Sequence, residues 1–179
     1  MDLNIREVRE NIKKQILDFS IQGVEKFLIN NPDLVFYAFA FDCNAEYAEI
    51  NLCFNTEIAF QKTLRHYQAG EYTSDYQSEE DIKYLRYNTG DWAYQCFDTL
   101  YVFSEDDLND ILNKLPDDDY KSWNIFTHDL LNIFTESLME FTKTDVYTKI
   151  PKAEDFTVFS IDHDEDLKEA IERYNSILL

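Results

Sequence analysis

The sequence predicts one α+β domain covering residues 1–179, built on a small, largely antiparallel sheet with an N-terminal hairpin packed by several helices. The length of 179 residues is typical of a single domain, and no linker or internal repeat divides it. Apolar residues recur with helical spacing in the longer segments, whereas strand-like patterns are short and do not alternate regularly with helices. This order favours an α+β domain over a doubly wound parallel sheet.

The first predicted helix covers residues 4–29. Its apolar residues follow one another at intervals of three or four positions, as a single helix face requires: Ile5, Val8, Ile12, Ile16 and Phe19. Proline has no amide proton and disfavours a helical residue before it, so this helix is expected to end ahead of Pro32.

Residues 34–42 and 47–54 are predicted to form a hairpin around a tight turn at Asn44-Ala45. One register places apolar residues opposite one another on a single face: Val35 with Phe54, Tyr37 with Leu52, Phe39 with Ile50, and Phe41 with Ala48. In this register Cys43 and Cys53 lie too far apart along the strands for a disulfide. We expect Cys43, Cys53 and Cys96 to be free thiols.

The later segments predict further helices and short strands. Helices are expected over 56–67, after Ser78, after Ser104, over 119–142 and in residues 165–179. Carboxylates follow both serines, as at many helix starts, because they interact favourably with the N-terminal end of the helix dipole. Asn88–Asp91 gives another cap signal, and Pro116 is expected to end the helix after Ser104. Residues 156–161 predict a strand, and residues 97–103 are a candidate for another.

The charge balance excludes several classes of partner. Acidic residues outnumber basic residues by 36 to 16, which gives a formal net charge of −20. Such a field repels nucleic acids and anionic membranes, so we expect neither as a direct partner. No apolar run is long enough to cross a membrane and no signal peptide is recognisable, so we expect a cytoplasmic protein. A basic protein, either a toxin or a nucleic-acid-binding protein, is the predicted partner.

The acidic surplus is concentrated in residues 71–81, 98–119 and 154–172, where acids exceed bases by five, seven and seven. Acidic helix starts and solvated faces explain part of it. Tyrosines lie among these acids, and tyrosine is a frequent anchor in protein interfaces. The predicted partner-binding residues come from the first two stretches: Tyr72, Asp75, Tyr76, Asp106, Asp107, Asp117, Asp118 and Asp119.

No motif in the sequence specifies a reaction. Three glycines cannot supply a glycine-rich phosphate loop, and spacing pairs no serine or cysteine with a histidine. The three histidines are far apart, so we predict no metal site and no cofactor. His163 is expected to be a solvated residue of the turn before the last helix, with Asp164 as the helix cap. We favour a binding protein over an enzyme.

Three stretches resemble a bacterial family of unknown function. They are an aromatic strand (FYAFAF, residues 36–41), a helix start (FNTE, 54–57) and YLRYNTGDWAY (84–94). The third contains Leu-Arg-aromatic followed by acid-Trp-x-Tyr, formed by Arg86, Asp91, Trp92 and Tyr94. In size and acidity the family is similar to the immunity proteins of bacterial polymorphic toxin systems. The resemblance implies an immunity-type protein that neutralises a basic, nuclease-like toxin, and it implies no catalytic residue.

One alternative from another class stays open. An enzyme or a small-ligand-binding protein could assemble its site from scattered residues near Arg86, Trp92 and Tyr94. Arg86 is expected to pair with Asp91. The two hypotheses differ in whether Arg86, Trp92 and Tyr94 line a concave pocket or pack in the core.

Overall fold

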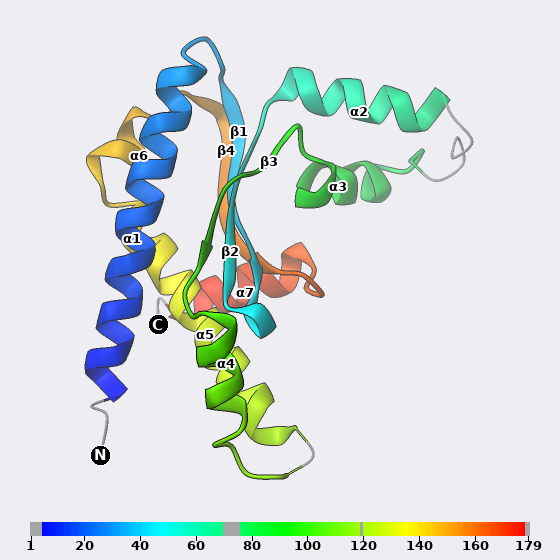
Figure 1. Cartoon of the computed structure of the whole chain (residues 1–179). Helices are drawn as coiled ribbons and strands as arrows, with labels where there is room; N and C mark the ends of the chain where they lie inside the picture. The colour runs from blue at the N-terminus through cyan, green and yellow to red at the C-terminus, as the bar shows by residue number, and fades with distance from the viewer. Residues whose placement is uncertain (1–4, 70–75, 119, 178–179) are drawn as a thin grey trace.

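The structure, a computed structural model, describes residues 5–69, 76–118 and 120–177 (Figure 1). Within these residues the chain forms seven α-helices, two short 3-10 helices (η) and four strands. Their order is α1 (Ile5–Asn30), β1 (Phe36–Asn44), η1 (Ala45–Tyr47), β2 (Glu49–Asn55), α2 (Glu57–Ala69), α3 (Glu79–Tyr87), η2 (Thr89–Asp91), β3 (Tyr94–Tyr101), α4 (Glu105–Leu112), α5 (Lys121–Phe141), α6 (Asp145–Lys149), β4 (Lys152–Asp162) and α7 (Leu167–Ile177).

The four strands form one sheet in the order β3-β2-β1-β4. β2 pairs antiparallel with both β1 and β3, whereas β4 runs parallel to β1 at the edge. The predicted α+β class, with a small and largely antiparallel sheet, is therefore confirmed. The parallel strand carries the chain after β4 to the same end of the sheet as the β1–β2 connection.

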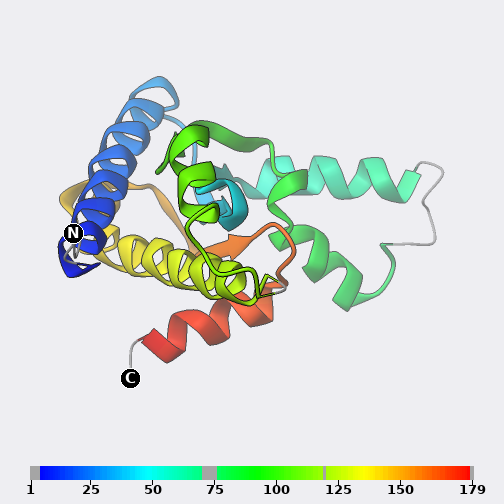
Figure 2. The ribbon, with the colours of Figure 1, turned by 60° about the horizontal axis from the view of Figure 1, so that its bottom comes forward.

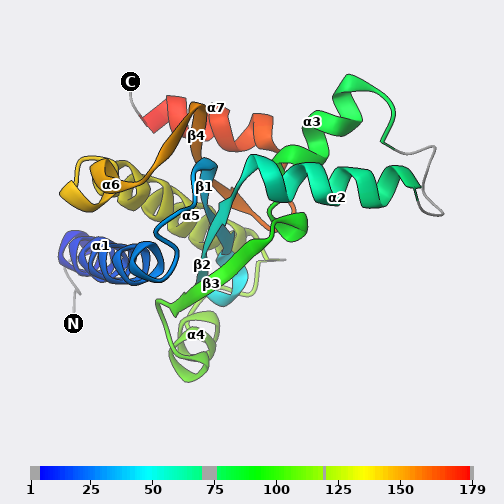
Figure 3. The same ribbon diagram turned by 90° about the horizontal axis from the view of Figure 1, so that it is seen from above.

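Helices cover both faces of the sheet (Figures 1 and 3). α1, α5 and α6 lie on one face, and α2 and α3 lie on the other. α7 packs beside β4 and α5, as Figure 2 shows from a second side. α1 approaches the sheet closely at Gly23, where a methyl group in place of the glycine hydrogen would lie 2.7 Å from Leu52 Cδ1.

Aromatic residues of the central strands fill the core. On the α1 side, Phe39 packs against Phe54 with ring centroids 4.7 Å apart, and Phe141 of α5 joins them. On the α3 side, Tyr37 and Trp92 pack edge to face at 6.1 Å. The sheet thus separates two apolar clusters, and each binds its own helices to the sheet.

The predicted hairpin exists, but its predicted register was wrong. Phe39 pairs with Phe54 and Phe41 with Leu52, so the β1 residues are displaced by four positions from the expected pairs. The cause is the connection, which is the 3-10 turn η1 followed by Ala48 with a left-handed φ of 50°, and not a two-residue turn at Asn44-Ala45. Because the displacement is even, Phe39, Phe41, Leu52 and Phe54 still share one side. Tyr37 was predicted on that side as well and lies on the other, because an irregularity between Phe36 and Ala38 interrupts the alternation and places Phe36 on the α1 side.

Other boundaries differ from expectation in smaller ways. Ser78 and Ser104 cap α3 and α4 through capping boxes, as predicted. The Asn88–Asp91 signal begins only the single turn η2, and β3 follows it. α4 ends at Leu112, before Pro116, and α6 was not expected. In the part of the chain that the structure describes, no helix has both the length and the apolar character needed to cross a membrane.

Candidate functional site

A cleft of about 700 Å³ opens between α3 and η2 on one side and the end of β4 with α7 on the other. This volume lies within the roughly 300–1,000 Å³ typical of ligand sites. Six carboxylates and two lysines line its walls, and one of the carboxylates, Glu165, is paired with Arg173, so three negative charges are uncompensated. The carboxylates are Asp42, Glu80, Asp162, Glu165, Asp166 and Glu172, and the lysines are Lys83 and Lys168.

Tyrosine and aliphatic side chains supply the apolar part of the wall. Tyr84 is 64% exposed, so its ring is accessible to a partner. Tyr87 is half-buried and packs edge to face on Phe159, which fixes its ring at the back of the wall. Leu167 and Ile171 line the opposite side from α7. A tyrosine beside carboxylates can bind a lysine or arginine side chain, because the ring packs on its methylenes and the carboxylates pair with its charge.

Asp42 of β1 lies at the inner end of the cleft. Burial raises the pKa of this carboxyl above its ordinary value, while a hydrogen bond with Thr89 and the nearby His163 oppose that rise. A partly buried carboxylate whose own charge is costly gains more from an incoming cation than a fully solvated one does. Asp42 is therefore a carboxyl in this cleft whose charge an incoming positive group would stabilise.

The turn after β4 is fixed by hydrogen bonds. The Ala45 amide donates to Asp162 Oδ1 at 3.0 Å, and the Asp162 amide donates to Glu165 Oε2 at 3.0 Å. Asp166 and Glu169 cap α7 reciprocally through backbone amides. The expectation that Asp164 caps this helix was wrong, because the helix begins at Leu167. His163 is exposed in the turn, as expected.

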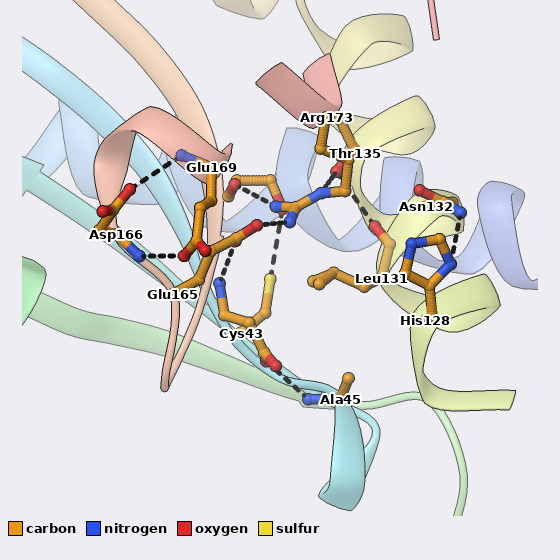
Figure 4. A network of polar contacts seen from close by, with 12 residues as sticks. Cys43, Ala45, His128, Leu131, Asn132, Thr135, Glu165, Asp166, Glu169 and Arg173 are labelled. Atoms are coloured by element: carbon orange, nitrogen blue, oxygen red, sulfur yellow. Dashed lines mark hydrogen bonds and ion pairs between the residues drawn. The ribbon is translucent and has the colours of Figure 1, made fainter. Parts of the chain in front are cut away.

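Arg173 of α7 holds this turn to the sheet and to α5 (Figure 4). Its guanidinium donates to Thr135 Oγ1 at 2.9 Å and to the Ser160 carbonyl at 2.6 Å, and it forms an ion pair with Glu165. The Arg173 and Glu165 side chains are only 8% and 14% exposed. Three anchors on one buried guanidinium keep the α7 wall of the cleft in place.

A second cavity, of about 530 Å³, lies on the other side of α7, toward α5. Both of its arginines are already engaged, because Arg9 pairs with Glu136 and Arg173 pairs with Glu165. His128 and Asn132 line it 3.3 Å apart within α5 (Figure 4). Five carboxylates against two arginines make this cavity acidic as well, but no tyrosine of the described residues lines it. The cleft beside α3 adds the exposed Tyr84 to its carboxylates and is therefore the better candidate for a binding site.

Arg86, Trp92 and Tyr94 do not share a pocket. Arg86 lies 2.6 Å from Glu57 and 2.7 Å from Asp155 and not beside Asp91, so the expected Arg86–Asp91 pair was wrong. Trp92 is buried on the α3 side, and its Nε1 donates to the Arg86 carbonyl at 3.0 Å. Tyr94 packs against Phe27 on the opposite face of the sheet. These residues hold elements together and leave no common surface for a substrate.

The predicted partner-binding residues fall into separate regions. Tyr72, Asp75 and Asp119 lie outside the described residues. The ring of Tyr76 packs on Tyr67 with centroids 4.8 Å apart. The remaining residues lie in or beside α4 and before α5, which project away from the α2–α3 pair (Figure 1): Asp106, Asp107, Asp117 and Asp118.

Two of these acids also serve helix starts. Asp107 closes the capping box of α4, and Asp118 accepts hydrogen bonds from the Ser122 hydroxyl at 2.6 Å and its amide at 3.1 Å. Both hydrogen bonds lower the pKa of Asp118 below its ordinary value. Sequence reasoning missed the cleft, although the third acidic stretch, 154–172, carried the signal for its α7 wall.

Comparison with known proteins places the chain in a family. The profile of a domain of unknown function, DUF4303, matches residues 16–176, which is most of the chain. The chain belongs to the DUF4303 family. No curated protein and no solved structure matches it. The DUF4303 match includes all four strands and both walls of the acidic cleft.

Proposed function

We propose that this DUF4303 protein is a non-enzymatic acidic binding protein of the immunity type, which neutralises a basic, nuclease-like toxin in the cytosol of the producing cell. One observation carries the proposal: the cleft between α3 and α7 combines three uncompensated negative charges with an exposed tyrosine. The overall charge of −20 supports it, because this field attracts basic proteins from a distance.

The size of the cleft defines how a partner would bind. A volume of about 700 Å³ accommodates a few side chains and not a whole protein face. The expected occupant is therefore one projecting basic segment of the toxin. Its lysine or arginine side chains would meet Asp42 at the inner end and Tyr84 at the rim. A nuclease presents such basic groups where it holds the phosphate backbone, so binding there would also block its substrate.

Two matched double variants test the location of binding. Glu80→Gln with Glu172→Gln removes two cleft carboxylates, one from the first turn of α3 and one paired with Lys168 at 3.8 Å. The control, Glu105→Gln with Asp110→Asn, removes one from the first turn of α4 and one paired with Lys114 at 3.8 Å. The two variants change the net charge equally and remove the same kinds of local interaction.

The probe is a fluorescent peptide of alternating arginine and glycine, and the readout is its dissociation constant. Exposed charge pairs contribute about 0.2–1 kcal/mol each, so the cleft variant should weaken binding about 2- to 30-fold. The α4 variant should weaken it much less. Equal weakening by both variants would mean that the peptide responds to net charge alone, and that result would contradict a binding cleft.

The toxin part of the proposal has a separate test in cells. A basic, nuclease-like protein that the wild-type chain captures from its source cells is expressed in a host with the wild-type chain, the cleft variant or the α4 variant. Growth should be rescued by the wild type and the α4 variant, and rescue should be weaker with the cleft variant. Growth arrest that the wild-type chain does not relieve would contradict the immunity role.

A further inference from the structure

Three strands bring together side chains that can bind a metal. Asp42 of β1, Cys53 of β2 and Cys96 of β3 each offer one ligand atom, and these atoms all lie within 4.8 Å of one another. Cys53 and Cys96 are 43 positions apart in the chain. Cysteine ligands often come as local pairs in sequence, and this arrangement has none, so spacing alone did not indicate it.

The backbone around Cys96 is shaped for this contact. The β2–β3 pairing is interrupted between Leu52 and Phe54, where Cys53 faces extra residues of β3. Cys96 takes a left-handed φ of 46°, which is unfavourable for a residue with a side chain. Its amide donates to Cys53 Sγ at 3.2 Å. Amide hydrogen bonds to a cysteine sulfur stabilise the thiolate and recur around metal-bound cysteines.

The three residues of the cluster differ in burial. Cys53 is buried, Asp42 is half-buried and Cys96 is exposed at the edge strand. An ion can therefore reach the cluster from solvent at Cys96 while two ligands are already held by the sheet. Cys43 is not part of the cluster, because it lies on the α1 side of the sheet with Phe41 and Ile50.

The donor set identifies the class of ion. Two thiolates select a soft or borderline metal, and a carboxylate as third ligand is compatible with Zn²⁺. Thiolates about 2.3 Å from a tetrahedral zinc lie about 3.8 Å apart. The ligand atoms, now within 4.8 Å, would need to approach by at most about 1 Å. Three protein ligands leave the fourth position for water, as in many zinc sites that are not purely structural.

We propose that Asp42, Cys53 and Cys96 form a Zn²⁺ site at the β2–β3 bulge. Binding displaces the two thiol protons, so one Zn²⁺ enters and two protons leave to solvent. The site shares Asp42 with the acidic cleft, so Zn²⁺ bound to this carboxylate would compete with a basic side chain of a partner there, whereas Cys53 and Cys96 do not line the cleft.

Cobalt provides the spectroscopic test, because Co²⁺ replaces Zn²⁺ in thiolate sites and absorbs visibly. The full chain, kept reduced and metal-free, is titrated with Co²⁺ and then with Zn²⁺. One equivalent of Co²⁺ should give a thiolate-to-cobalt charge-transfer band, and one equivalent of Zn²⁺ should remove it. Asp42→Asn should keep the band and weaken the affinity by at least about 10- to 100-fold, the loss that removal of an outer-shell partner already causes.

Cys96→Ser is the decisive variant because Cys96 is exposed, and circular dichroism checks that its fold is intact. It should lose the dithiolate band, whereas the control Cys43→Ala should keep it. A reduced wild-type protein without the band would overturn the site, and so would a folded Cys96→Ser variant with an unchanged band. Air oxidation to a Cys53–Cys96 disulfide, without metal uptake by the reduced protein, would also overturn it.

Discussion

The guanidinium of Arg86 in α3 lies 2.7 Å from the Asp155 carboxylate in β4. The same group lies 2.6 Å from Glu57 of α2 and 4.0 Å from the centroid of the Tyr37 ring. One side chain therefore connects two helices and an edge strand, and it fixes the α3 wall of the acidic cleft to the sheet. The most distinctive residues of the sequence motif, Arg86 and Trp92, meet at the Arg86 carbonyl and build structure.

Replacing Arg86 should lower stability moderately. Arg86→Met removes two ion pairs whose carboxylates are 52% and 60% exposed, together with a cation–π contact. Exposed ion pairs contribute about 0.2–1 kcal/mol and a cation–π contact about 0.5–1 kcal/mol, so we expect a loss of about 1–3 kcal/mol in urea unfolding. The control Arg65→Met, on the exposed face of α2, should change stability by less than about 0.5 kcal/mol. If Arg86→Met lost as little stability as the control, the proposed role of Arg86 in connecting α2, α3 and β4 would be contradicted.

Replacing Arg173 should cost more, because its ion pair is buried. Arg173→Met leaves Glu165, whose side chain is 14% exposed, without its cation, and an orphaned buried charge costs about 3–5 kcal/mol. Adding Glu165→Gln to this variant should recover part of the loss, since the orphaned charge is then gone. Lys168→Met, at an 80% exposed side chain, is the control. Additive losses in the double variant, by urea unfolding, would argue against the buried pair.

The contribution of Asp118 to stability should depend on pH, and Ser122 should set the pH range of that dependence. Because the folded state lowers the pKa of this carboxyl, its stabilising contribution is present above the unfolded pKa of about 3.9 and is lost as pH falls through the folded pKa. Ser122→Ala removes the hydroxyl donor and should raise the pKa of Asp118 toward the unfolded value. Carboxyl NMR titration measures this directly. Thr127→Ala, whose hydroxyl donates to the Asn124 carbonyl, should leave the Asp118 curve unchanged.

Local patterns predicted most of the elements and the faces of most strand residues, with α6 and Tyr37 as exceptions. The two-residue alternation of Leu52 and Phe54 identified a buried face, and that face survived an error of four positions in register because the error was even. Ser78 and Ser104 marked helix starts because a capping box depends only on neighbouring residues.

Contacts between segments far apart in the sequence could not be predicted from local patterns. No local pattern in residues 152–162 predicts that this strand pairs parallel with β1. That pairing brings Asp162 to Ala45 and creates the α7 wall of the cleft. The approach of Cys96 to Cys53 depends on a bulge and a left-handed residue, and periodicity encodes neither. Acidic stretches were visible in the sequence, but the fold alone decides which of them face each other.

The most direct test of the account is to locate the bound basic peptide by amide NMR shifts in the full chain. Titration with the arginine–glycine peptide should shift amides of residues 80–90 and 161–172, the two walls of the cleft. Residues 105–118, around α4, should move little. The largest shifts at 105–118, or shifts spread evenly over the acidic surface, would contradict the cleft as the binding site.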